Sequence, residues 1–292
     1  MQSKKQIQQL LAYAGVQPQR GLGQHFLVDL NLLRLIVNSA QITERDLVLE
    51  VGCGTGSLTE GLAESAGRVI AVEYDPVLAN IATEQLKDAI NTQVLNCDIL
   101  DNKRSFGTQV TDALNSARKQ YRGRFLLVAN LPYKVASPVI INMVAGAFVA
   151  DEMYVTVQKE VAQRMTAQPD TAEYGHMGIL LAATGRTRIA RILKPTVFWP
   201  QPQVDSALVE FVRDKDKSAR IKDFQLLIAV VNLFMGHRRK TIKACTRLAE
   251  GSLAGIDNWL DILANCGIDP AKRPEQLSPQ HYVDVANHCS AQ

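Results

Sequence analysis

The sequence predicts a doubly wound α/β domain followed by a small all-α domain. In the first two thirds of the chain, short apolar segments alternate with helical patterns, and a glycine-rich segment at 52–56 joins the first of these segments to a helix. After residue 213 only helical periodicity remains. Alternation of this kind is typical of a mostly parallel sheet covered by helices, and we expect seven strands in it.

Composition and length agree with this fold class. A chain of 292 residues with 47% hydrophobic content can form one large and one small domain. No apolar run is long enough to cross a bilayer, and the first residues lack the apolar core of a signal peptide. The five cysteines are dispersed, without metal-type spacing, which favours reduced thiols in a cytoplasm and no bound metal. The net charge of +3 is a weak indication of an anionic partner.

The individual elements follow from apolar spacing. Strands are predicted at 47–51, 69–72, 93–97, 125–129, 153–158, 186–194 and 207–212. Helices are predicted at 7–14, 31–40, 58–63, 75–86, 110–119, 138–147, 160–167, 178–184, 224–236 and 279–287, with further helices opening at His237 and around Trp259. Residues 101–123 are otherwise polar, so we expect a loop around the helix at 110–119.

The charged segment 214–218 is the predicted linker between two domains, which we place at 1–213 and 214–292. In the second domain, Lys240, Lys243 and Arg247 fall on one face of the helix expected after His237. A basic helix face is often only solvated, but this one suits a phosphate backbone.

The glycine segment and two acidic residues outline one crevice. Gly52 and Gly54 directly follow a strand, but their spacing is not that of a dinucleotide site, so we expect a ligand without pyrophosphate. Glu73 ends the next strand, where a ribose-binding carboxylate is expected, and Asp98 ends the strand after it. The structural alternatives are a tight turn for the glycines and helix caps or solvated charges for the acids.

Asn130, Leu131, Pro132 and Tyr133 directly follow the apolar strand at 125–129. An adenine amine is a poor nucleophile because its lone pair is delocalised into the ring. The Asn130 amide oxygen and a main-chain carbonyl can hold its two N–H groups and direct the lone pair at an electrophile, while Tyr133 stacks on the base. The structural alternative is an ordinary turn, in which Asn and Pro are common.

Two aromatic segments accompany this site. Residues 198–206 place Phe198 and Trp199 beside prolines, in a stiff loop that could hold a ring or simply bury its aromatics. His25 lies in an irregular, glycine-containing segment between Gly21 and Phe26 that is expected to lie close to another part of the site. Taken alone, a histidine in such a segment is more often a turn or packing residue than a ligand contact.

Taken together, eight features occur in the order typical of one family. They are residues 23–27 (GQHFL), 50–56 (EVGCGTG), Glu73, Asp98, 130–133 (NLPY), 158–161 (QKEV), 198–206 (FWPQPQVDS) and 238–240 (RRK). Over nearly the whole chain this set resembles the ribosomal RNA small-subunit adenine dimethyltransferases of the kasugamycin-sensitivity type. The chain departs from that pattern at His25, where the family usually has Asn, and at 134–137, where Lys-Val-Ala-Ser replaces Asn-Ile-Ser-Thr.

The resemblance implies a Rossmann-like class I methyltransferase domain at 1–213 with S-adenosyl-L-methionine as its cofactor. It implies cofactor-binding roles for His25, Leu27, Gly52, Gly54, Glu73, Asp98 and Asn130. Among these, Glu73 would bind the ribose hydroxyls and Asp98 the adenine amine. The implied catalytic residues are Asn130, which would orient the target N6, and Tyr133 and Phe198, which would sandwich the flipped base.

The implied reaction is N6,N6-dimethylation of two adjacent adenines in the 3′-terminal hairpin of small-subunit (16S) rRNA, during small-subunit biogenesis. The implied partners are this rRNA and pre-small-subunit particles, bound by the helical domain at 214–292. The residues implied in RNA binding are Arg238, Arg239, Lys240 and Lys243. We expect a cytoplasmic monomer with no membrane partner.

Two other functions remain open at this point. A large-subunit rRNA adenine N6-methyltransferase of the macrolide-resistance type shares the fold and the residues that hold the target base. Leu131 and the sequence of residues 200–206 favour the small-subunit type. A non-catalytic rRNA-binding assembly factor would keep the pocket only for its structure, and the presence of Glu73, Asp98 and Asn130 argues against it.

Overall fold

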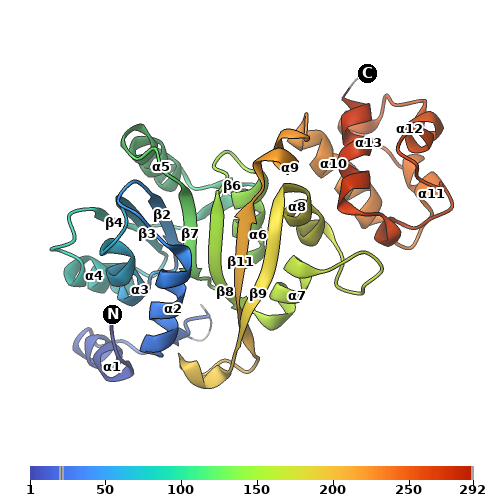
Figure 1. Cartoon of the computed structure of the whole chain (residues 1–292). Coiled ribbons are helices and arrows are strands. Elements are labelled where there is room, and N and C mark those ends of the chain that lie inside the picture. The colour runs from blue at the N-terminus through green and yellow to red at the C-terminus, as the bar shows by residue number, and fades with distance from the viewer. Residues whose placement is uncertain (20, 22, 291–292) are drawn as a thin grey trace. The chain divides into compact units, whose positions relative to one another are not determined.

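The computed structural model describes residues 1–19, 21 and 23–290. Its central sheet has seven strands in the order β4-β3-β2-β7-β8-β11-β9 (Figure 1). Their bounds are β2 Leu47–Val51, β3 Arg68–Glu73, β4 Thr92–Asn96, β7 Phe125–Asn130, β8 Glu152–Gln158, β9 Gly185–Leu193 and β11 Ser206–Arg213. Strands β4, β3, β2, β7 and β8 are parallel neighbours and β11 is antiparallel to β8, which confirms the predicted seven-stranded, mostly parallel sheet.

The strand order reverses between β2 and β7. The chain adds β3 and β4 on one side of β2, and β7 and β8 on the other. Crossover connections then leave on opposite sides, so a crevice forms outside the carboxyl ends of these two strands. The glycine segment follows β2 and the Asn130 segment follows β7, so the topology brings the two predicted motifs to the same edge.

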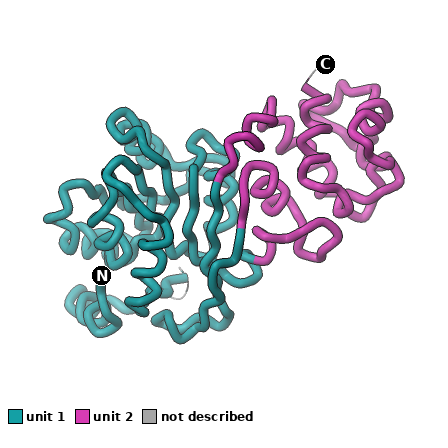
Figure 2. Tube along the Cα trace, viewed as in Figure 1, with its two compact units in different colours: residues 1–162, 188–212 teal, residues 163–187, 213–292 magenta. Residues whose placement is uncertain are grey.

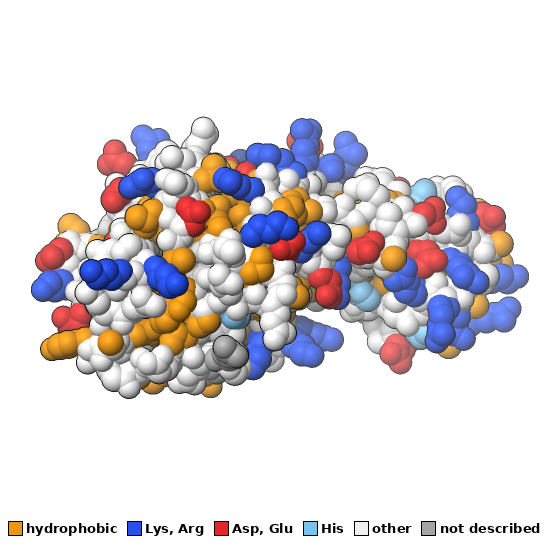
Figure 3. All heavy atoms as spheres, turned by 90° about the horizontal axis from the view of Figure 1, so that it is seen from below, with side chains coloured by type: hydrophobic (Ala, Val, Ile, Leu, Met, Phe, Trp, Pro, Cys, Tyr) orange, Lys and Arg blue, Asp and Glu red, His pale blue; other side chains and the backbone are white. Residues whose placement is uncertain are grey.

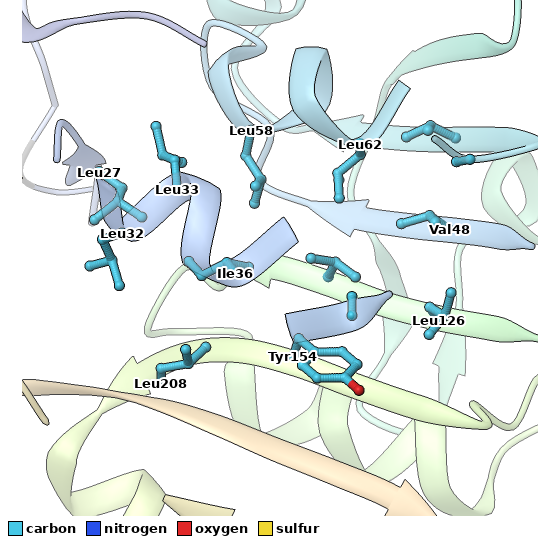
Figure 4. Close-up of a cluster of buried hydrophobic side chains, with 14 of the residues drawn as sticks. Leu27, Leu32, Leu33, Ile36, Val48, Leu58, Leu62, Leu126, Tyr154 and Leu208 are labelled. Carbon is cyan, nitrogen blue, oxygen red and sulfur yellow. The ribbon is translucent and has the colours of Figure 1, made fainter. Parts of the chain in front are cut away.

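The helices of this part of the chain match the predicted pattern closely. They are α1 Lys4–Tyr13, α2 Leu30–Ala40, α3 Ser57–Ala63, α4 Pro76–Gln85, α5 Thr108–Gln120, α6 Ala136–Ala145 and α7 Lys159–Thr166. Asp29 and Asp75 begin α2 and α4 as N-caps, because each carboxylate accepts hydrogen bonds from the N–H groups of the first turn. Leu32 and Ile36 of α2 and Leu62 of α3 pack with Val48 and other strand residues in one buried cluster (Figure 4).

Two short strand pairs were not predicted. Strands β5 Leu100–Asn102 and β6 Ser105–Phe106 form a hairpin where a loop was expected, with the Asn102 side chain bonded to Ser105 Oγ and to the N–H of Arg104. Strand β1 Phe26–Leu27 pairs with β10 Phe198–Trp199. Elements of two or three residues leave no periodic signal, so only their partners define them.

The chain divides into two compact units (Figure 2). Unit 1 contains Met1–Ala162 and Arg188–Val212, and unit 2 contains Gln163–Thr187 and Arg213–Gln292. Most of the segment 214–218, which was expected to be a charged linker, is helical, because Lys215–Ala219 forms the helix α9. Asp214 caps that helix, and Lys217 Nζ donates to the carbonyls of Ala182 and Gly185 within unit 2.

Unit 2 is mostly helical, apart from the start of β9 and the end of β11. Besides α9 it contains α8 His176–Thr184, α10 Phe224–Gly236, α11 Ile242–Thr246, α12 Trp259–Asn265 and α13 Pro279–Cys289. The ring of Phe234 packs 6.3 Å from that of Trp259 and 6.0 Å from that of Tyr282, between centroids. The helix expected to open at His237 begins instead at Ile242, because Thr241 caps it, so Lys240 does not share a helix face with Lys243.

Candidate active site

A cavity of about 320 Å³ lies where the sequence predicted a crevice. Residues of the glycine segment, the ends of β3 and β7 and the segment after β4 contribute to its wall, together with residues before and within β1. Eight of the predicted site residues line it: His25, Leu27, Gly52, Gly54, Glu73, Asp98, Asn130 and Tyr133. The fold therefore brings together side chains that are up to 108 positions apart in the sequence, from His25 to Tyr133.

The glycine segment has a backbone that L side chains rarely adopt. The φ angles of Gly52, Gly54 and Gly56 are 78°, 59° and 85°. A Cβ atom on Gly52 would lie 2.6 Å from Pro132 Cγ, and one on Gly54 would lie 3.1 Å from the Phe26 ring. These glycines thus allow the segments carrying Pro132 and Phe26 to close around the cavity, which the sequence alone did not indicate.

Glu73, the last residue of the neighbouring strand β3, binds the backbone of the glycine segment. Its side chain is 7% exposed, Oε2 accepts a hydrogen bond from Gly54 N at 2.8 Å, and Oε1 accepts one from Asp75 N at 2.9 Å. Burial raises the pKa of the Glu73 carboxyl, while these two N–H groups oppose the rise. Each carboxyl oxygen keeps a second acceptor site, so the predicted bond to ribose hydroxyls stays compatible with this geometry.

Glu50 is a cavity residue to which the sequence analysis gave no separate role. It interrupts the apolar strand β2, is 2% exposed, and its Oε2 accepts the hydroxyl hydrogen of Thr59 at 2.7 Å. Burial, with a smaller contribution from the charge of Glu73, raises the pKa of Glu50 to about 8. The Glu50 carboxyl is therefore mostly protonated at neutral pH in the structure, and an acid inside an apolar strand was the signal that could have identified it.

We expect Glu50→Gln to change how stability depends on pH. The pKa of Glu50 rises from its ordinary value of 4.5 to about 8 on folding, so between these values unfolding releases a proton. The wild type should therefore lose roughly 3 kcal/mol relative to the non-titrating variant as the pH rises from 5 to 8, and the difference should level off about one pH unit higher. Thermal unfolding without cofactor at several pH values measures this, and parallel curves for the two proteins would show that Glu50 is ionised throughout.

Gln2 is a second cavity neighbour that sequence reasoning missed. It is 3% exposed, its Nε2 donates to the Thr55 carbonyl at 3.0 Å, and the Thr55 hydroxyl donates to its Oε1 at 2.6 Å. The N–H of Gln2 also donates to Ser57 Oγ at 2.8 Å. The residues before α1 thus support the glycine segment directly, through a contact that no local pattern could indicate.

Asn130 ends β7 with its side-chain amide held on both sides. Its Nδ2 donates to the His25 carbonyl at 2.9 Å, and its Oδ1 accepts the hydroxyl hydrogen of Thr156. The next N–H, that of Leu131, donates to the Thr156 carbonyl at 3.1 Å. The Pro132 carbonyl already accepts from two N–H groups of the following turn, so the Leu131 carbonyl is the main-chain acceptor that fits the predicted pair.

Tyr133 and His25 form an aromatic corner beside Asn130. Their ring centroids are 5.7 Å apart, and the Tyr133 hydroxyl shares a hydrogen bond of 2.8 Å with Ser206 Oγ. His25 Nδ1 lies 2.7 Å from the Pro200 carbonyl oxygen, and Lys134 Nζ donates to the Gly21 carbonyl. Burial raises the pKa of Tyr133, so its hydroxyl stays neutral at physiological pH.

Phe198 differs from the other predicted catalytic residues. It pairs with Leu27 across β1 and β10, is 2% exposed, and belongs to the same buried cluster as Leu27. Leu27 also borders the cavity, whereas Phe198 does not. A base could reach the Phe198 ring only if its neighbours moved, so stacking by Phe198 stays a prediction.

The remaining predicted residues are at the surface. Asp98 borders the cavity, and its Oδ1 accepts a hydrogen bond from Leu100 N at 3.0 Å. In unit 2, Arg238 is bonded to Glu275 Oε2 through Nε at 2.9 Å and to the Ala172 carbonyl, so its guanidinium already stabilises that unit. Arg239, Lys240 and Lys243 are exposed.

No group of three or more His, Cys, Asp or Glu side chains among the described residues could hold a metal ion. Within the same residues, no helix combines the length and the apolar character that crossing a membrane requires.

The sheet order, the glycine segment after β2 and the acidic residue ending β3 define the class I methyltransferase fold. Two solved structures share this fold. A dimethyladenosine transferase from Plasmodium falciparum has a TM-score of 0.72 at 21% identity, covering 91% of this chain and 98% of its own. The 23S rRNA methyltransferase ErmE has a TM-score of 0.61 at 21% identity, covering 91% and 99%.

Sequence comparison identifies the family. The model described as "Ribosomal RNA adenine dimethylase" matches residues 16–289. A protein named ribosomal RNA small subunit methyltransferase A from Pelotomaculum thermopropionicum is 35% identical over 96% of this chain and 94% of its own length. The protein of the same name from Pediococcus pentosaceus is 36% identical over 95% and 92%. The chain belongs to the ribosomal RNA adenine dimethylase family.

Proposed function

We propose that this protein transfers methyl groups from S-adenosyl-L-methionine to N6 of two adjacent adenines in the 3′-terminal hairpin of 16S rRNA. The observation that carries the proposal is the oriented amide of Asn130 at the border of an acidic cavity, next to Leu131 and the Tyr133 ring. The name shared by relatives at 35–36% identity supports the small-subunit rRNA as substrate.

The cavity suits a cationic ligand that carries hydroxyl groups. Glu73 and Asp98 supply acidic side chains, whereas Glu50 is mostly protonated and adds no charge, and the amine of Lys134 at the border is bonded to a carbonyl. A phosphate-bearing cofactor would meet mostly acceptors here, whereas S-adenosyl-L-methionine offers a sulfonium, an ammonium and ribose hydroxyls. Glu73 would bind the hydroxyls, Asp98 the adenine amine, and Gly52 and Gly54 would flank the amino-acid end. When bound, the cofactor supplies an electrophilic methyl group.

The residues around Asn130 would perform the chemistry by positioning. Asn130 Oδ1 and the Leu131 carbonyl accept the two N–H groups of the adenine amine and direct its lone pair out of the ring plane. Tyr133 stacks on the base, and this stacking stabilises the flipped base by about 1–3 kcal/mol. It thereby offsets part of the few kcal/mol that flipping the base out of its stack costs. Positioning of this kind can contribute roughly 7–11 kcal/mol, and no strong base is needed, since the nitrogen becomes acidic only after it gains the methyl group.

RNA binding is proposed for the exposed cations. Figure 3 shows Lys and Arg side chains on the surface of both units. In unit 2 the candidates are Arg239, Lys240 and Lys243, since Arg238 is engaged by Glu275. In unit 1 they are the cations along and after β9, among which Arg188 and Lys194 also form ion pairs with Glu210 and Asp205.

Removing two of these cations should weaken RNA binding in a salt-dependent way. For Arg239→Ala with Lys243→Ala, we expect the slope of log K against log salt to become shallower by about one to two, since each lost phosphate contact releases fewer counterions. Fluorescence titration of a 3′-terminal 16S fragment at several salt concentrations measures it. A matched double variant at the exposed Lys87 and Lys119 carries the same charge change. Equal slopes for the two double variants would refute a specific role for unit 2.

The function itself is tested by product analysis. Purified protein is incubated with S-adenosyl-L-methionine and undermethylated small or large subunits, and the rRNA nucleosides are separated by mass spectrometry. We expect N6,N6-dimethyladenosine in the 3′ end of 16S rRNA only. Modified adenine in 23S rRNA would support the macrolide-resistance alternative. Cofactor binding without any modified nucleoside would support the non-catalytic assembly factor. The monomeric state, the cytoplasmic location and the binding of pre-small-subunit particles remain part of the proposal.

A further inference from the structure

Thr156 is a polar residue inside an apolar strand, and the mechanism above gives its side chain no role. It lies in β8, is 1% exposed, and contacts both residues that the reaction requires. Its hydroxyl donates to Asn130 Oδ1, and its carbonyl accepts from the N–H of Leu131 at 3.1 Å. Thr156 thus contacts both of the consecutive residues whose oxygen atoms would accept the target amine.

The sheet register produces this contact. Asn130 and Thr156 are paired residues of the parallel strands β7 and β8, so their side chains leave the same face of the sheet. The neighbours of Thr156, Val155 and Val157, point to the opposite face and cannot replace it. The pairing of β7 with β8 therefore fixes the position of the short Thr156 side chain and its hydroxyl.

The His25 carbonyl and the Thr156 hydroxyl together hold the Asn130 amide in one of its two orientations. The His25 carbonyl can only accept a hydrogen bond, so it binds Nδ2, at 2.9 Å. The Thr156 hydroxyl donates on the other side and so binds Oδ1. Turning the amide over would place its oxygen against the His25 carbonyl oxygen. Because an amide oxygen has two acceptor sites, Oδ1 keeps one for an N–H of the substrate.

We propose that Thr156 is a positioning residue for methyl transfer, whose hydroxyl holds Asn130 Oδ1 in the orientation that accepts the target amine. This inference rests on the proposed function, in which Asn130 binds that amine. Without the hydroxyl, only the His25 carbonyl holds the amide, and Oδ1 loses the bond that fixes its direction. The adenine lone pair is then aimed less well at the electrophile.

Thr156→Val removes the hydroxyl with little change of shape. We expect the methylation rate at saturating cofactor and small subunits to fall about ten- to a hundredfold. The affinity for S-adenosylhomocysteine, measured by calorimetry, should stay within about twofold, since Thr156 does not border the cavity. Thr156→Ser restores the hydroxyl and should recover most of the rate. If Thr156 acted only through packing, Thr156→Val should be faster than Thr156→Ser, because Val keeps the side-chain volume that Ser loses.

Thr184→Val provides the matched control. Thr184 is buried in α8, its hydroxyl donates to the Leu180 carbonyl at 2.8 Å, and it is not among the residues that line the cavity. It should lower thermal stability without lowering the rate. If the wild type is active and Thr156→Val is equally active, the inference about Thr156 is wrong while the proposed function stands. The same holds if Thr156→Ser is as slow as Thr156→Val. A wild type that methylates no 16S rRNA would reject the proposed function and this inference with it.

Discussion

Asn130→Ala is expected to abolish methylation of 16S rRNA while cofactor binding is nearly retained. The substitution removes the only side-chain oxygen among the two acceptors proposed for the target amine, and the remaining Leu131 carbonyl can hold one N–H group. We expect a fall in rate of at least about a hundredfold, because a misdirected lone pair cannot attack in line. Tritium transfer from labelled cofactor to undermethylated small subunits measures the rate.

Because Asn130 also donates to the His25 carbonyl, the alanine variant loosens a wall of the cavity. S-adenosylhomocysteine binding by calorimetry separates this effect from the loss of chemistry. Asn130→Asp is the informative companion, since it keeps an oxygen for Thr156 but places a second oxygen against the His25 carbonyl. We expect it to be slow as well. Turnover of Asn130→Ala at the wild-type rate would remove Asn130 from the mechanism.

Gly52→Ala is expected to be the most damaging single methyl group that can be added to unit 1 near the cavity. Gly52 has a φ of 78°, and its new Cβ would lie 2.6 Å from Pro132 Cγ and 2.9 Å from Pro132 Cδ. The left-handed backbone costs about 1–2 kcal/mol and the overlap about 1–3 kcal/mol more. Relief of the overlap moves Pro132, and with it the Leu131 carbonyl, so methylation should fall together with stability.

Gly15→Ala separates the two contributions to this effect. Gly15 has a φ of 70°, and nothing lies within 4 Å of its added Cβ, so only the backbone strain applies. Urea unfolding of both variants should show a loss for Gly52→Ala that exceeds the loss for Gly15→Ala by more than about 1 kcal/mol. Equal losses would mean that Pro132 is not packed against the glycine segment in solution.

Much of the fold was predictable because it is local. Apolar runs of strand length and apolar residues at helical spacing gave the seven strands and most helices, and the glycine segment and Asn130 fell at strand ends. In a parallel sheet such ends share one edge, so the sequence also indicated that Gly52, Glu73 and Asp98 would outline one crevice. The order of the motifs, read as a family resemblance, added the reaction.

The tertiary structure decided what depends on partners distant in the chain. Phe26 pairs with Trp199, and Phe198 is buried beside Leu27 instead of facing the cavity. Arg238 is engaged by Glu275, although its sequence neighbours look equally basic.

The same reason explains why sequence alone gave no role to Glu50 or Thr156. The high pKa of Glu50 arises from burial under several segments, and the contact of Thr156 with Asn130 arises from strand register. A sequence pattern reports which residues are apolar and how the backbone turns within a few residues. Charge state, hydrogen-bond partner and accessibility are set by atoms that only the folded chain brings within reach.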